Sequence, residues 1–146
     1  MAFTIRKIEV WAGDMRNRPG MLARVLEALE TTGAELEFCV ARRVTENTSR
    51  VFLAPLRTAA QKNAARDVGL LPATGMNTIR IEGPNRPGLG ATMNRAIATA
   101  GINGRGLTAA AIGRKSVTYI AFKTAEERDA AMKALKKALS SKLGRR

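Results

Sequence analysis

The tetrapeptide Asn-Arg-Pro-Gly occurs twice, at residues 17–20 and 85–88, and this repeat restricts the fold more than any other feature. The two copies lie 68 residues apart, and the match continues without a gap to a closing glycine. The identical pairs beyond the turn are Ala23 and Ala91, Ala28 and Ala96, Thr31 and Thr99, and Gly33 and Gly101. A chain of 146 residues that repeats itself in this way is expected to contain two similar small units.

Each turn opens an amphipathic helix, because apolar residues recur after it at spacings of three and four. They are Leu22, Val25, Leu26 and Leu29 in the first copy, and Leu89, Met93, Ala96, Ile97 and Ala100 in the second. Pro19 and Pro87 are expected in the first turn of these helices, where proline is tolerated. Gly33 and Gly101 are expected where the helices end.

A second helix follows in each copy, beginning at Thr58 and at Thr124. In the later one, Thr124 and Glu127 form a capping box, which is a signature of a helix N-terminus. The apolar face of this helix consists of Ala131, Met132, Leu135 and Leu139.

Alternating apolar and polar residues predict the strands. The predicted strands at residues 7–12 and 77–82 precede the two turns. Ile8 and Ile79 are 71 residues apart, whereas the turns are 68 apart, so the first copy should carry about three extra loop residues. The runs after the first helices, residues 36–44 and 50–56, and 107–112 and 116–122, are hairpins with short polar turns. The segment 69–83 is too short for two comfortable strands, which suggests one long strand serving both copies.

The order in each copy is strand, helix, strand, strand, helix, with a possible last strand, which predicts a ferredoxin-like α+β unit. We therefore expect two tandem βαββαβ units, residues 1–72 and 73–146, the second ending in a basic tail. Units of this size are marginal alone, so they should share or pair antiparallel sheets with helices on one side.

Charge is concentrated in the second half, where 14 Lys and Arg face 4 Asp and Glu. The C-terminal cluster consists of Lys133, Lys136, Lys137, Lys142, Arg145 and Arg146. Such a cluster could bind nucleic acid or another polyanion. It could equally be a solvated tail after a helix whose lysines complement the negative helix end. The strands lack paired aromatic residues, and no helix-turn-helix or zinc-ligand pattern is visible, so nucleic-acid binding is the second alternative.

The composition argues against an enzyme. The chain has no histidine, one cysteine and no spaced carboxylate pair in an apolar setting, so neither a metal site nor a cofactor is expected. Cys39 lies in an apolar run and is expected to be a buried, inert thiol. No run has the length of a membrane span and the N-terminus is not typical of a signal peptide, so a cytoplasmic location is expected.

The stretch from Ile81 to Leu107 resembles the start of an ACT domain, the small amino-acid-sensing module. It is similar in particular to the regulatory domain of phosphoglycerate dehydrogenase, where an Asn-Arg-Pro-Gly turn opens the first helix and a Gly-aliphatic-Asn triplet closes it. The resemblance covers nearly the whole chain as two copies. It implies a non-catalytic regulatory module that binds a free amino acid or a similar small ligand. Such a module acts through homodimers or larger oligomers, or on a regulated enzyme.

The turn suits this role because the first backbone N–H groups of a helix have no internal partners and attract an anion such as a carboxylate. A glycine there lets a ligand approach the backbone, and asparagine offers both a donor and an acceptor. The candidate site residues are Asn85, Arg86, Pro87, Gly88, Leu89, Asn103 and Gly104 in the second copy, and Asn17, Arg18 and Gly20 in the first. The alternative is a turn kept for its geometry alone.

The resemblance implies a ligand held between the turn of one domain and the second strand of its neighbour. Asn85 and Asn103 occupy the positions of the ligand-binding asparagines in the resembling domain, and Asn17 could replace Asn85 if the copies pair within one chain. Two departures are visible. Glu35 stands where the first copy should carry its second asparagine, and Gly83 stands where the serine-binding domain carries a histidine.

Overall fold

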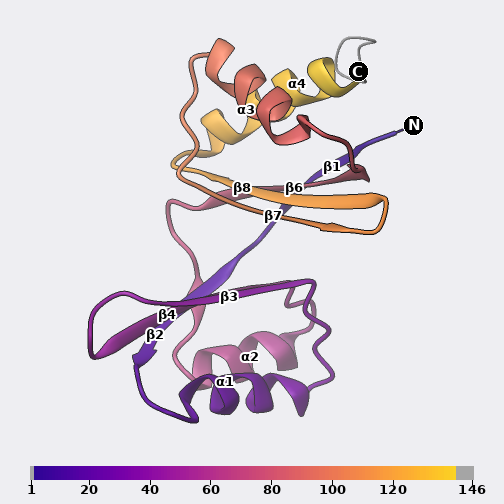
Figure 1. Cartoon of the computed structure of the whole chain (residues 1–146). Helices are drawn as coiled ribbons and strands as arrows, with labels where there is room; N and C mark the ends of the chain where they lie inside the picture. The colour runs from indigo at the N-terminus through magenta and orange to yellow at the C-terminus, as the bar shows by residue number, and fades with distance from the viewer. Residues whose placement is uncertain (1, 141–146) are drawn as a thin grey trace. The chain divides into compact units, whose positions relative to one another are not determined.

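The computed structural model describes residues 2–140, which form two compact units (Figure 1). The first unit runs from Glu9 to Thr74. The second combines the N-terminal residues up to Ile8 with the chain from Gly75 onward. Each unit is a four-stranded antiparallel sheet with two helices on one face. In the part of the chain that is described, no helix is long and apolar enough to cross a membrane.

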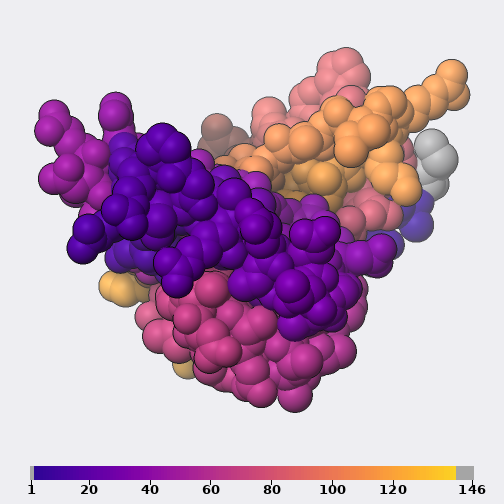
Figure 2. Space-filling model, turned by 90° about the horizontal axis from the view of Figure 1, so that it is seen from below, coloured from indigo at the N-terminus to yellow at the C-terminus, as the bar shows by residue number. Residues whose placement is uncertain are grey.

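The first unit has the complete βαββαβ order, and its sheet order is β3-β4-β2-β5. Its elements are β2 (Trp11–Arg16), α1 (Met21–Glu30), β3 (Phe38–Arg43), β4 (Thr48–Ala54), α2 (Ala59–Asp67) and β5 (Leu71–Pro72). The core lies between sheet and helices and contains Trp11, Leu29, Leu53 and Leu70, each almost fully buried. α1 and α2 contact each other, and in the view from below their residues, indigo to purple and magenta, cover one face of this unit (Figure 2).

The second unit has the sheet order β1-β6-β8-β7. Its elements are β1 (Thr4–Ile8), β6 (Asn77–Pro84), α3 (Leu89–Thr99), β7 (Gly106–Ile112), β8 (Lys115–Phe122) and α4 (Ala125–Ser140). The buried apolar residues of α3 and α4, which include Met93, Ile97 and Leu135, pack on Ile79 and Phe122 of the sheet. The predicted apolar face of α4 is confirmed, with Met132 partly buried beside it.

The fourth strand of the second unit comes from the N-terminus of the chain. β1 pairs antiparallel with β6, from Thr4 opposite Glu82 to Ile8 opposite Thr78. In the first unit the equivalent edge is filled by β5, which follows α2 directly. The division therefore differs from the expected boundary between residues 72 and 73, because residues up to Ile8 belong to the later unit. The sequence 7–12, expected as one strand, spans the end of β1 and the start of β2.

The strands that precede the two turns match each other more closely than the sequence predicts. β2 continues to Arg16 and β6 to Pro84, so the offset of 68 residues holds up to the turns. The prediction of three extra loop residues was wrong, because Ile8 belongs to β1 and Trp11 is the true counterpart of Ile79. The prediction of one long shared strand was also wrong, because β5 and β6 are separate strands in two different sheets.

The helix boundaries follow the expected signals with one shift. α1 begins at Met21 and α3 at Leu89, so the two prolines precede the N-cap glycines instead of lying in the first helical turn. The ends are confirmed: Gly33 and Gly101 have φ of 73° and 78°, the left-handed conformation that glycine adopts easily. Thr58 caps α2 in a capping box with Gln61, and the Thr124 hydroxyl accepts a bond from the Glu127 amide at 3.1 Å.

Cys39 is exposed on β3, so the expectation of burial was wrong. β3 is an edge strand, and its residues alternate between partly buried and exposed along most of its length. Desolvation by the surrounding protein nevertheless raises the pKa of the Cys39 thiol, which disfavours the reactive thiolate.

Candidate functional site

The second Asn-Arg-Pro-Gly turn joins β6 to α3 and leaves backbone donors free. The Asn85 amide donates to the Arg114 carbonyl at 2.7 Å, which ties the turn to the β7–β8 hairpin. Gly88 is the N-cap of α3 with φ of 83°, and no side chain caps the helix. The next amides, of Gly90 and Ala91, have no hydrogen-bond acceptor among residues 2–140. The turn thus presents two donors of the kind that bind carboxylates.

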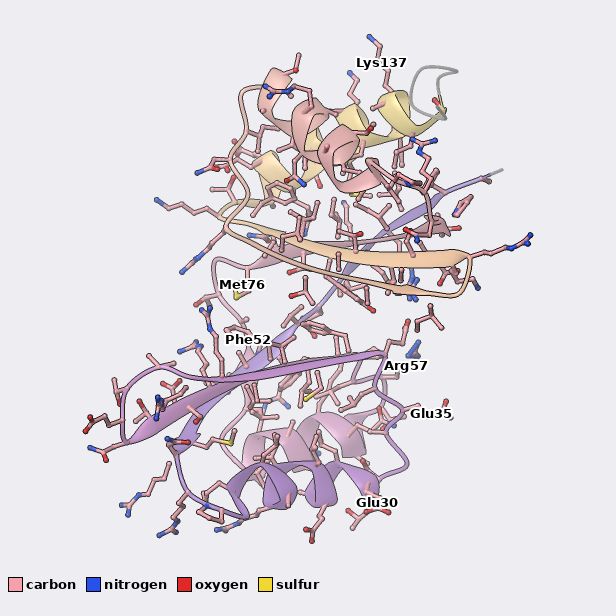
Figure 3. All side chains as sticks on the ribbon, viewed as in Figure 1. Glu30, Glu35, Phe52, Arg57, Met76 and Lys137 are labelled. Atoms are coloured by element: carbon pink, nitrogen blue, oxygen red, sulfur yellow. The ribbon has the colours of Figure 1, made fainter. Side chains whose placement is uncertain are left out.

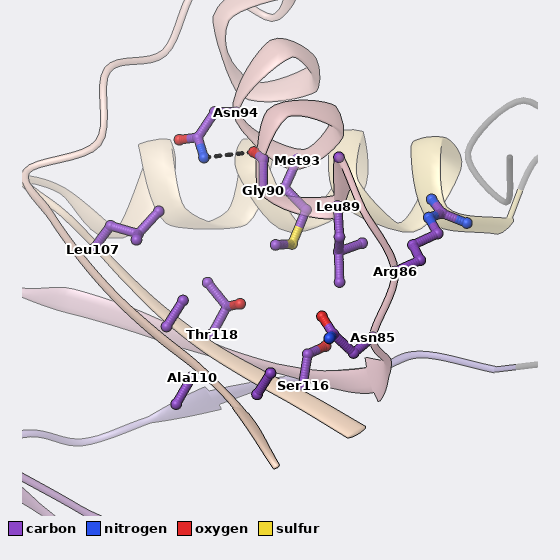
Figure 4. Close-up of a pocket in the computed structure, with 13 residues that line it drawn as sticks. Asn85, Arg86, Leu89, Gly90, Met93, Asn94, Leu107, Ala110, Ser116 and Thr118 are labelled. Carbon is purple, nitrogen blue, oxygen red and sulfur yellow. Dashed lines mark hydrogen bonds between the residues drawn. The ribbon is translucent and has the colours of Figure 1, made fainter. Parts of the chain in front are cut away.

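A cavity of about 280 Å³ lies at this turn, between the start of α3 and the strands β7 and β8 (Figure 4). Most of the lining is aliphatic or small: Leu89, Met93, Leu107, Ala109, Ala110 and Ala111. The polar side chains that border it are Asn85, Asn94, Ser116 and Thr118. Such a combination of apolar walls and a few polar groups is typical of small-molecule sites.

Asn85 is the polar side chain of this cavity that is best able to bind a ligand. Ser116 is buried and its hydroxyl donates to the Gly83 carbonyl at 3.1 Å. Asn94 donates to the Gly90 carbonyl at 2.8 Å, drawn as the dashed line in Figure 4. Asn85 is exposed, and its side-chain amide makes no hydrogen bond within the described part of the chain. Its donor and acceptor are both available.

Within one unit, the structure does not bring the two expected asparagines together. Asn85 precedes the N-terminus of α3, whereas Asn103 and Gly104 follow its C-terminus. The 11 residues of α3 separate them along the helix axis by roughly 16 Å at 1.5 Å per residue. A site that uses both side chains therefore needs Asn103 from another copy of the chain.

In the first copy, the asparagine of the turn already has partners. The Asn17 side chain donates to the Glu46 carbonyl at 3.1 Å and accepts a bond from the Ser49 hydroxyl at 3.1 Å. Its backbone amide donates to the Asn47 carbonyl at 2.8 Å. Glu35 is exposed in the loop between α1 and β3, at the far end of α1 from this turn (Figure 3). Asn17 therefore serves the hairpin next to it and is not free to bind a ligand.

The structure also accounts for the candidate residue Arg86 and for Gly83, which departs from the resembling domain. The Arg86 side chain extends away from the cavity toward the end of α4 (Figure 4), and its Nε and Nη2 are buried without a hydrogen-bond partner among residues 2–140. Gly83 lies against the Phe3 ring, which leaves no room for a Cβ there. The place of the histidine in the resembling domain is thus taken by a side chain from the N-terminus.

The basic cluster is only partly described. Lys133, Lys136 and Lys137 are exposed on α4, and Lys137 points away from the helix at its end (Figure 3). Lys142, Arg145 and Arg146 lie outside the described residues.

The chain's sequence matches no protein-family model and no curated protein. Solved structures do match its fold. Protein BT0572 from Bacteroides thetaiotaomicron superposes with a TM-score of 0.76 at 15% identity, over 91% of this chain and 89% of that one. The ligand-free regulatory subunit of aspartate kinase from Thermus thermophilus gives 0.67 at 18% identity, over 94% and 96%. The chain has the ACT-type fold.

A third solved structure has the same fold. A putative C-terminal regulatory domain of aspartate kinase from Porphyromonas gingivalis gives a TM-score of 0.59 at 16% identity, over 96% of this chain and 97% of that one. At these identities the likeness establishes the fold, and the function must be argued from the site.

Proposed function

We propose that the chain is a non-catalytic regulatory module that binds a free amino acid at the turn of its second copy. One observation carries this proposal: Asn85, with its free side chain, and Gly90, whose amide is unpaired beside that of Ala91, border one small, mostly apolar cavity. The amides suit the carboxylate of an amino acid, and the oxygen of Asn85 suits its ammonium group. The aliphatic wall suits a small side chain.

The site is completed by a second copy of the chain, paired along β7. β7 is the edge strand of its sheet, and all seven of its residues are exposed. Leu107 and Ile112 of this strand are 49% and 77% exposed. Large apolar side chains exposed together beside a cavity often mark an interaction surface. An unpaired edge with apolar residues is a template for pairing with another strand.

Antiparallel pairing of two β7 strands would bring the expected asparagines together. In such a pair the start of one strand lies beside the end of the other. Asn103 lies three residues before the start of β7, and Arg114 lies two residues after the end of β7. The carbonyl of Arg114 accepts the hydrogen bond from the Asn85 amide. Asn103 of the partner subunit would therefore approach Asn85. Each dimer would then hold two equivalent sites.

A thermal-shift screen of the free amino acids against the full chain tests the ligand. A ligand that binds only the folded state raises the melting temperature, so at least one amino acid should do so. Calorimetry with that amino acid should then show weaker binding, by about tenfold or more, for Asn85→Ala and for Asn103→Ala. Asn63→Ala, an exposed change on α2, is the matched control. The proposal fails if none of the amino acids shifts the melting temperature.

Mixing the two variants tests the shared site. A heterodimer of Asn85→Ala and Asn103→Ala subunits contains one intact site and one doubly changed site. After subunit exchange, about a quarter of all sites should regain the affinity of the original protein. No recovery in a mixture that light scattering shows to be dimeric would contradict a site made from two subunits.

A further inference from the structure

The first unit also contains a cavity at its Asn-Arg-Pro-Gly turn. The side chains around this cavity are strongly basic, unlike those around the cavity of the second unit. This cavity measures about 300 Å³ and lies between the first Asn-Arg-Pro-Gly turn, the start of α1 and the ends of β3 and β4. Four arginines border it: Arg16, Arg18, Arg42 and Arg43. All four are exposed, and none forms an ion pair with any residue between 2 and 140. Like charges gathered in this way repel one another and attract an anion.

The other copy shows that the fold does not require these charges. The strand and turn positions equivalent to the four arginines are Pro84, Arg86, Ala110 and Ala111. Three of these are uncharged, and the fourth, Arg86, extends away from its cavity (Figure 4). The same backbone therefore forms without the cluster, so the arginines of the first unit need another explanation than folding.

The remaining groups around the cavity also favour an anion. The amides of Leu22, which lines the cavity, and of Ala23, the next residue of α1, have no acceptor within the described chain, and no acidic residue lies in that turn. Ser49, which also lines the cavity, already donates its hydroxyl to the Asn17 side chain, so the arginines and the amides are the donors available to an anion. A helix N-terminus adds a positive partial charge to that of the arginines.

Within the described chain, no acidic side chain of the first unit forms an ion pair with these four arginines. Asp14 pairs with Arg50 at 3.1 Å, and Glu37 pairs with Arg57 at 3.8 Å. Glu30 and Glu35 lie at the other end of the unit, where α1 finishes (Figure 3). Glu46, in the β3–β4 hairpin, contributes its backbone carbonyl to Asn17. The basic end of this unit is left with a surplus of positive charge around a cavity.

We propose that this cavity binds a small multivalent oxyanion, a molecule with two or more phosphoryl or carboxylate groups. The guanidinium fork of arginine matches both groups with paired, charge-assisted hydrogen bonds. The volume equals that of about ten water molecules, which is enough for a small metabolite. This site lies in the other repeat from the amino-acid site, so either proposal can fail without the other.

Calorimetry of the full chain with inorganic pyrophosphate and with citrate, in a buffer of low ionic strength, tests the proposal. Tighter binding of pyrophosphate points to a phosphorylated ligand, and tighter binding of citrate points to a polycarboxylate. Arg43→Ala, which recreates the residue of the second copy, should weaken the better probe about tenfold, and Arg18→Ala with Arg43→Ala should remove measurable binding. Arg95→Ala removes the same charge from an exposed position on α3 and should leave the affinity within about twofold.

Two results would overturn the proposal. One is equal affinity in the Arg18→Ala, Arg43→Ala double variant and the Arg95→Ala control, with circular dichroism showing that both are folded. The other is a duplex DNA that binds more tightly than either small anion and loses affinity in the same double variant. That result would identify an extended polyanion surface, whose binding falls steeply with salt.

Discussion

Ile5 lies directly opposite Ile81, so the second repeat completes its sheet with a strand from the opposite end of the chain. Phe3 and Ile5 both pack against the core formed by α3, α4, β6 and β8. The intervening residues, from Glu9 to Thr74, form the whole first unit. The second unit is thus a βαββαβ fold in which the last strand has been moved to the front of the sequence.

We expect Ile5→Asp to destabilise the second unit selectively, by about 2–3 kcal/mol, because it removes apolar contact and places a carboxylate against the core. Hydrogen exchange should show faster exchange of the β6 amides that pair with β1, while the α1 and α2 amides are unchanged. Thr4→Ala, an exposed change in the same strand, is the control. Equal acceleration in both units would contradict an effect confined to the second one.

The sequence predicts most of the elements of the fold but not this strand exchange. The repeat, the helix periodicity and the hairpin turns are local signals, and the helices and hairpins they predict are present. Which strand fills the last edge of a sheet depends on contacts between residues far apart in the chain, such as Thr4 with Glu82 and Ile8 with Thr78, and leaves no local pattern. The run from Lys7 to Ala12 alternates like one strand although it contains the ends of two.

Asn17 and Asn85 occupy the same position in the two repeats and should respond differently to replacement by alanine. Asn17→Ala removes two side-chain hydrogen bonds and leaves the buried Ser49 hydroxyl without its acceptor, so we expect a loss of about 1–2 kcal/mol in unfolding free energy. Asn85→Ala removes a side chain without hydrogen bonds in the described chain and should change stability by less than about 0.5 kcal/mol. Urea denaturation followed by circular dichroism measures both. The assignment of roles is wrong if the two values are equal.

The turn of the candidate site could be predicted from the sequence, but the rest of the site could not. Asn85, Arg86, Gly88 and Leu89 do border the cavity of the second unit. The wall formed by β7 and β8 was not expected, because the pairing of the turn with Arg114 becomes visible only in three dimensions. Arg42 and Arg43 are visible in the sequence as two adjacent charges near the end of a predicted strand. Such a pair alone does not indicate a binding site. Only the folded structure brings it to the same cavity as Arg16 and Arg18.

Gly88 and Gly90 are two residues apart and should respond in opposite directions to an added side chain. Gly88 has φ of 83°, so Gly88→Val forces a branched residue into the left-handed region and should cost at least about 1–2 kcal/mol, whether or not a ligand is present. Gly90 lies inside α3, and a Cβ there meets no atom within 4 Å. Gly90→Ala should therefore stabilise the protein by about 0.4–1 kcal/mol. Thermal unfolding of both variants checks the pair. A loss of stability in Gly90→Ala would show that the space beside α3 is not open.

The ion pairs of Glu82 predict how stability responds to acid. A hydrogen bond from Arg80, whose Nη2 lies 2.9 Å from the carboxylate, and the charge of Lys115 lower the pKa of Glu82. Because the pKa is lower in the folded state, the contribution of Glu82 is fully present above the unfolded value of about 4.3 and is lost as pH falls through the lowered value. Glu82→Gln should therefore reduce the melting temperature at pH 7 and have a smaller effect near pH 3. Glu126→Gln, an exposed change in the first turn of α4, is the control. A decrease for Glu82→Gln that is the same size at both pH values would show that the ion pairs do not carry the effect.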